Sequence, residues 1–187
     1  MFEAPARNIA ETPDAHDSIA DSFLDDYLDT FFIMHFLGDL PPLGINEHHT
    51  PHPHVTFLGH ALSNSKTKSY SFVKDIKNET ALVKPFTLEA REIKFFGISK
   101  NIPVVKCENT IESQELHDNL LKAQEASNLS LAQPYFAGKF FTPHSSLIEG
   151  YPVLQGAVNV DSFTVTRHIG GYGSGVVDVM AHFLLTP

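Results

Sequence analysis

The chain has 187 residues and a formal net charge of −9 at pH 7, and 42% of its residues are hydrophobic, which is enough for one sizeable core. The acidic balance argues against tight binding of long nucleic acid, because a basic surface that neutralises phosphates supplies most of that affinity. It is compatible with a small anionic ligand or with the end of a strand. No apolar run reaches the roughly 18 to 20 residues of a membrane span, so we expect no membrane partner.

The cysteine content and the first residues point to a reducing compartment. Cys107 is the single cysteine, so neither an intrachain disulfide nor a multi-cysteine zinc site can form. Residues 1–17 are polar and acidic and lack the basic and apolar regions of a signal peptide. We therefore expect a cytoplasmic protein, and we expect it to be a monomer.

The chain is predicted to begin with a loose tail over residues 1–13, followed by a single domain over residues 14–187. A helix is predicted over 14–29, where Ile19, Phe23 and Tyr27 recur every four residues. The aromatic and branched residues 30–37 predict a buried strand, and the Pro- and Gly-rich residues 38–53 predict a loop.

Most of the remaining chain has the pattern of strands. A short strand is predicted from His54 to Gly59, whereas residues 63–69 are polar and 70–83 give no clear prediction. The clearest helix covers 112–127, where leucines recur at helical spacing. The other predicted strands cover 84–97, 102–109, 138–150, 157–170 and 175–185. Many strands with two clear helices predict an α+β fold, with antiparallel pairing.

Five histidines lie among residues 47–60, which suggests a metal site built from His48, His49, His52 and His54. Two histidines spaced H-x-H on a strand share a face and can share a metal. However, a zinc hydrolase site of this kind continues H-x-H-x-D-H, and Thr56 stands where the aspartate is needed. We expect no functional metal and no cofactor. A metal-dependent hydrolase that uses residues 48–54 remains an alternative.

A second observation concerns a motif that occurs once in each half of the chain. His54 is followed two residues later by Thr56, and His144 is followed two residues later by Ser146. The two histidines are 90 positions apart, and each follows a proline. Side chains at i and i+2 of a strand point to the same face. Each histidine is therefore expected to share a face with its hydroxyl residue.

Two such pairs facing each other suit phosphodiester chemistry without a metal. A neutral imidazole can take a proton from the attacking water or hydroxyl, while a protonated imidazole gives a proton to the leaving oxygen. Histidine suits both roles because its pKa of about 6.5 allows either form near neutrality. The two hydroxyls can bind the non-bridging phosphate oxygens as negative charge develops.

The stretches "HVTFLG", "FTLEAREIKFFG", "IPVVKCEN", "SQELHDNLLKAQEAS" and "KFFTPHSSLIEG" resemble the 2H phosphoesterase superfamily, the LigT-like group. That group includes 2′-5′ RNA ligases and RNA 2′,3′-cyclic phosphodiesterases, and the resemblance covers about residues 54–150. It implies a bilobal α+β fold in which two antiparallel sheets flank a central groove with helices outside. It also implies catalytic roles for His54 and His144 and phosphate-binding roles for Thr56 and Ser146. One departure is a Pro-rich loop where the family usually has a helix, between the first strand and the first motif.

The resemblance implies hydrolysis of a 2′,3′-cyclic phosphate or a 2′-5′ linkage, at an RNA 3′ end or in a small nucleotide, and without a metal. Reversal of the same step would be 2′-5′ RNA ligation. A non-catalytic protein that binds nucleotides or RNA ends on the same fold is a second alternative. Further candidates for contacts in the groove are His52, Tyr135, Lys139, Tyr151 and Arg167.

Overall fold

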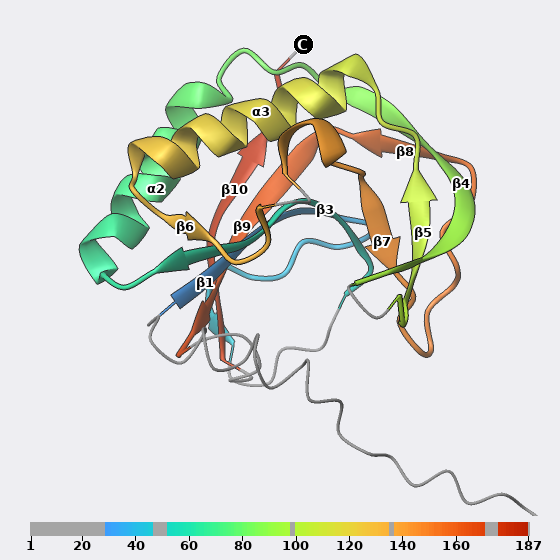
Figure 1. Cartoon of the computed structure of the whole chain (residues 1–187), viewed down its shortest axis with the longest axis horizontal. Helices are drawn as coiled ribbons and strands as arrows, with labels where there is room; N and C mark the ends of the chain where they lie inside the picture. The colour runs from blue at the N-terminus through green and yellow to red at the C-terminus, as the bar shows by residue number, and fades with distance from the viewer. Residues whose placement is uncertain (1–28, 47–51, 98–99, 135–136, 171–175, 187) are drawn as a thin grey trace, which may run out of the picture.

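The computed structural model describes residues 29–46, 52–97, 100–134, 137–170 and 176–186, and the helix predicted over 14–29 lies outside this range. The described chain folds as an α+β domain with an extensive antiparallel sheet (Figure 1). Its strands are β1 (Asp29–Phe36), β2 (Gly44–Asn46), β3 (His54–Ser63), β4 (Phe86–Phe96), β5 (Ile102–Cys107), β6 (Ser130–Leu131), β7 (His144–Ser146), β8 (Ala157–Val160), β9 (Ser162–Ile169) and β10 (Val177–Leu184). Its helices are α2 (Lys66–Glu79), α3 (Ile111–Ala126) and the 3-10 turn η2 (Gly138–Phe140).

The sheet has two halves that meet where the two motif strands lie side by side. The strand order is β2-β10-β9-β1-β3-β7-β5-β4-β8, and β6 pairs with β3 outside this path. A single residue pair, Thr56 opposite His144, joins the two halves. The chain returns from the second half to the first at Asp161, between β8 and β9. The predicted α+β fold with antiparallel sheets is therefore confirmed.

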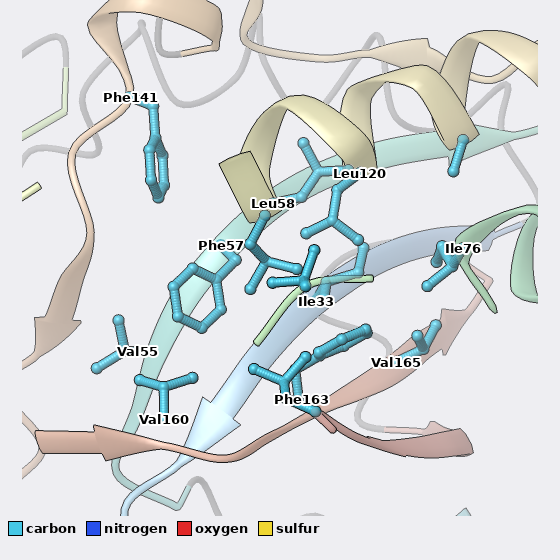
Figure 2. Close-up of a cluster of buried hydrophobic side chains, with 14 of the residues drawn as sticks. Ile33, Val55, Phe57, Leu58, Ile76, Leu120, Phe141, Val160, Phe163 and Val165 are labelled. Atoms are coloured by element: carbon cyan, nitrogen blue, oxygen red, sulfur yellow. The ribbon is translucent and has the colours of Figure 1, made fainter. Parts of the chain in front are cut away.

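The main core lies between one face of the sheet and the helices α2 and α3, which both cover that face (Figure 1). Ile33 from β1, Phe57 from β3 and Phe163 from β9 pack here against Ile76 of α2 and Leu120 of α3 (Figure 2). Full burial of each such side chain contributes roughly 1.5–3 kcal/mol to folding. Because Phe57 points into this core, Thr56, which precedes it on β3, is directed to the opposite face.

The helix predicted over 112–127 is confirmed as α3. Its N-terminus is a capping box, in which the Thr110 side chain accepts from the Ser113 N–H and the Ser113 side chain accepts from the Thr110 N–H. Leu116, Leu120 and Ala123 form its buried face. This helix is specified by its local sequence, because its N-terminal cap and its apolar stripe predict the same helical segment.

Helix α2 was not predicted, because its sequence is rich in Ser, Thr and Asn, whose side chains compete for backbone hydrogen bonds. Its buried stripe consists of Ser69, Phe72 and Ile76. The Ser69 hydroxyl donates to the carboxylate of Asp29 on β1, at 3.1 Å. Packing against the sheet therefore decides this helix, more than its own periodicity does.

Four predictions of strands and loops were wrong. The single strand predicted over 157–170 is divided at Asp161 into β8 and β9, which lie in different halves of the sheet. The strand β3 continues past Gly59 to Ser63 through an irregular pairing with β1. The strand predicted over 138–150 is reduced to β7, because Gly138 adopts a positive φ of 59° in the turn η2 and Pro143 has no N–H to donate. The predicted loop 38–53 contains the short strand β2, which pairs with β10. None of the helices in the described ranges is both long and apolar enough to cross a membrane.

Candidate active site

The two motifs lie on adjacent antiparallel strands, on the sheet face away from α2 and α3. Thr56 on β3 is directly opposite His144 on β7, so both side chains project from the same face. His54 lies two residues before Thr56 and Ser146 two residues after His144, so both share that face. All four side chains are half-buried, whereas Val55 and Ser145, which lie between the residues of each motif, are buried on the other face. We call the surface formed by His54, Thr56, His144 and Ser146 the histidine face.

The two motifs share one local hydrogen-bonding pattern. Nδ1 of His54 lies 2.7 Å from the carbonyl oxygen of His52, and Nδ1 of His144 lies 2.8 Å from the carbonyl oxygen of Thr142. A carbonyl oxygen only accepts, so Nδ1 carries the proton in both neutral rings. Nε2 is then the nitrogen that can accept or donate a proton in catalysis. In each motif a proline separates the histidine from the residue whose carbonyl fixes it.

An aromatic ring flanks each motif histidine. The Phe36 ring on β1 lies 5.9 Å from the His54 ring between centroids. The Phe96 ring on β4 lies 4.7 Å from the His144 ring. Together with the carbonyl contacts, these rings restrict both imidazoles to one orientation, as a general acid–base pair requires.

Burial is the largest influence on the pKa of both motif histidines and lowers each below 6.5. The bonds from their rings to the backbone carbonyls partly offset this lowering. Charge on His144 and on His52 lowers the pKa of His54 further. A proton on His144 therefore disfavours a proton on His54.

His117 on α3 joins β3 to the turn η2 and was not singled out from the sequence. Its Nδ1 donates to the carbonyl oxygen of Phe57, next to Thr56, at 2.7 Å. Its Nε2 accepts from the Gly138 N–H at 3.0 Å, and its ring stacks on Phe141 with centroids 4.0 Å apart. Both nitrogens of the neutral ring are thus engaged, and burial lowers its pKa. In the sequence His117 only follows a leucine of the helical stripe, so nothing there indicates this role.

The further candidates for groove contacts differ in where they lie. His52 lies beside His54, with its ring 6.1 Å from the same Phe36 ring. Tyr151 lines, together with Ser146, a small cavity of about 40 Å³ at the end of β7. Lys139 is exposed on η2, with its ammonium group 5.0 Å from the centroid of the neighbouring Phe140 ring. Tyr135 lies outside the described residues.

Arg167 lies on the helix-covered side of the sheet, away from the histidine face. It pairs on β9 with Phe31, a residue of the main core. Its guanidinium contacts the carboxylates of Asp178 at 2.6 Å and Asp29 at 3.6 Å. The structure therefore does not support Arg167 as a contact in the groove; it is a buried ion-pair residue that ties β1, β9 and β10 together.

The metal alternative depends in part on residues that are not described, since His48 and His49 lie outside the described range. Among the described residues, no group of three or more His, Cys, Asp or Glu side chains could hold a metal ion. Nδ1 of His54 is engaged by a carbonyl oxygen, which leaves Nε2 as its potential ligand atom.

Solved structures similar to this chain share one fold. A phosphoesterase structure matches 85% of this chain and 99% of its own, with 14% identity and a TM-score of 0.57. Apo LigT of E. coli matches 86% of this chain and 99% of its own, with 15% identity and a TM-score of 0.56. TT0787 of Thermus thermophilus matches 83% of this chain and 97% of its own, with 18% identity and a TM-score of 0.55. No protein-family model and no curated protein sequence matches the chain.

At these low identities the likeness concerns the architecture. The chain has a LigT-like fold, which the resemblance of its sequence implied. The matched region covers nearly all of each similar structure.

Proposed function

We propose that this protein is a phosphodiesterase that uses His54 and His144 as a general acid–base pair without a metal ion. Its substrate is a 2′,3′-cyclic phosphate or a 2′-5′ phosphodiester, at an RNA 3′ end or in a small nucleotide. The observation that carries the proposal is the repeated motif geometry: two histidines on adjacent strands, each with Nδ1 fixed by the carbonyl two residues earlier. A protein that only binds its ligand has no need for two imidazoles oriented in this way.

In the proposed reaction, Nε2 of the neutral motif histidine takes a proton from the attacking water as its oxygen bonds to phosphorus. The protonated motif histidine gives its proton to the leaving ribose oxygen as the P–O bond breaks. Thr56 and Ser146 donate hydrogen bonds to the non-bridging oxygens, where negative charge increases in the transition state. Each acid–base group contributes roughly 10²- to 10⁴-fold in rate. If an RNA 5′-hydroxyl takes the place of water, its oxygen bonds to the phosphorus of a 2′,3′-cyclic phosphate while the 3′ oxygen leaves with a proton from the protonated histidine, and the product is a 2′-5′ ligated RNA.

The similar structures support a nucleotide substrate. LigT of E. coli has been crystallised in complex with 3′-AMP, with phosphate and with ATP. The net charge of −9 suits a short ligand better than a long polyanion.

The test is hydrolysis of 2′,3′-cyclic AMP and of 2′-5′-linked oligoadenylate in excess EDTA. The variants His54→Asn and His144→Asn are informative because the asparagine amide can still donate to the backbone carbonyl while Nε2 is lost. His182→Asn is a matched control, since this half-buried histidine of β10 bonds the Thr164 hydroxyl and the Pro41 carbonyl instead. We expect at least a 10²-fold loss in each motif variant and little change in the control.

The alternatives predict other outcomes of this experiment. Activity that is lost in EDTA but kept in His144→Asn would refute the proposal in favour of a metal-dependent hydrolase using residues 48–54. Binding of both nucleotides without turnover would refute it in favour of a nucleotide- or RNA-end-binding protein.

A further inference from the structure

Lys106 on β5 is a basic side chain directly beside the histidine face. It is the register partner of His144 on β7, so the two side chains project from the same face. The Cβ atoms of such directly opposed residues are about 4.5–5.5 Å apart. Lys106 is half-buried, as the motif residues are. Across the strands the order is Thr56, His144 and Lys106, with His144 in the middle.

The acidic neighbour of Lys106 is engaged elsewhere. Glu92 on β4 is its register partner on the other side and would be the natural counter-ion. The Glu92 carboxylate instead lies 3.0 Å from the ammonium group of Lys94 on its own strand. Lys106 belongs to none of the ion pairs formed among the described residues. On the face that it shares with His144, its positive charge is therefore not neutralised by a carboxylate from the described part of the chain.

We infer that Lys106 is an anion-binding residue of this site that holds a charged oxygen of the substrate phosphate on the far side of His144 from Thr56. The inference rests on the proposed function and extends the phosphate contacts from two hydroxyls to two hydroxyls and one ammonium. Neighbouring strands lie about 4.8 Å apart, and the flexible stem of a lysine spans that distance. In a chain with a net charge of −9, a local cation offsets the repulsion that an anionic substrate would meet.

Lys106 was not predicted from the sequence, because "IPVVKCEN" reads as an ordinary strand in which Lys106 is the first polar residue. Its position beside His144 depends on the pairing of β5 with β7, whose partner residues are about 40 positions apart. Lys94, one strand further along the same face and already paired with Glu92, offers a matched comparison.

The test compares Lys106→Met, Lys106→Arg and the control Lys94→Met, which is made together with Glu92→Gln so that no carboxylate is freed to pair with Lys106. Affinity for inorganic phosphate is measured by NMR titration of the imidazole C–H signals of His54 and His144, which needs no turnover. KM and kcat are measured with 2′,3′-cyclic AMP, and thermal unfolding checks the fold of each variant. We expect Lys106→Met to weaken phosphate binding and to raise KM by roughly tenfold to a hundredfold, the range of one charge-assisted hydrogen bond. Lys106→Arg is expected to retain most of the affinity, and Lys94→Met to stay within about twofold of the wild type.

Phosphate affinity that is unchanged in Lys106→Met, equal losses in Lys106→Met and Lys94→Met, or no binding of phosphate by the wild type would each overturn the inference. A failure of the proposed function can be distinguished from a failure of this inference. If the wild type hydrolyses neither nucleotide but binds phosphate in a Lys106-dependent way, the anion site stands and the assigned reaction is wrong.

Discussion

His60 makes the stability of the fold depend on pH, and the size of this effect follows from its surroundings. It lies on β3 in a left-handed conformation, with φ of 53°, and its ring packs edge-on against Phe32 with centroids 4.8 Å apart. Burial lowers its pKa from 6.5 to about 4. Because the folded pKa lies below the unfolded value, the unfolded chain binds the proton more readily. The stability contributed by neutral His60 is therefore fully present above pH 6.5 and is lost as the pH falls toward 4.

The pKa difference sets the magnitude. At 1.36 kcal/mol per pKa unit, a shift from 6.5 to about 4 destabilises the fold by about 2 kcal/mol at pH 5 and by about 3 kcal/mol at pH 4. The variant His60→Asn removes the titrating ring and keeps a residue that tolerates a positive φ.

Urea unfolding of the wild type and of His60→Asn at pH 7.5, 5 and 4 isolates this contribution. Other groups that titrate in this range affect both proteins, so the difference between the two pH dependences belongs to His60. We expect the wild type to lose about 3 kcal/mol more than the variant between pH 7.5 and pH 4. Parallel pH dependences for the two proteins would refute the reasoning.

Three other predictions concern the histidine face and its supports, and a fourth concerns the buried ion pairs. Because the pKa values of His54 and His144 are lowered, kcat/KM for 2′,3′-cyclic AMP should reach its maximum below pH 6.5. Above pH 6.5 it should fall by up to about tenfold per pH unit, and a maximum near pH 8 would contradict this prediction. In His52→Asn one limb of that pH profile should move to higher pH, because a charge that lowers the pKa of His54 is removed while the backbone carbonyl remains. An unchanged profile would show that the charge on His52 does not affect the pKa of His54. His117→Ala should lower the free energy of unfolding, measured in urea, by about 2–4 kcal/mol, because two backbone groups lose their hydrogen-bond partner. A decrease below about 1 kcal/mol would argue against a structural role for His117. Arg167→Met should lower the free energy of unfolding by roughly 3–5 kcal/mol, because two carboxylates are left without their cation. The KM of the folded protein should not change, and a raised KM would indicate that Arg167 contacts the substrate.

The sequence by itself determined the features that depend on short-range periodicity. The alternation in a strand puts His54 with Thr56 and His144 with Ser146, whatever the rest of the fold does. The N-terminal cap and the apolar stripe of α3 predict that helix from its own residues, without any distant contact. These local patterns also predicted the antiparallel α+β class, and the resemblance to the LigT-like group implied the LigT-like fold. The roles of the four motif residues remain a proposal that the hydrolysis assay tests.

Only the tertiary structure decided which of these local pieces lie next to one another. Strand pairing brings Thr56 opposite His144 and puts Lys106 on the other side of that histidine, across about 90 and 40 positions of the chain. Such contacts carry no signal in a short window, because the register of two strands is set by the packing of the whole sheet. The same holds for His117, whose two bonds join a helix to a strand and to a distant turn, and for Arg167, whose face is set by the buried carboxylates around it. The identity of the chemical groups could thus be derived from the sequence, but the geometry that lets them act together could not.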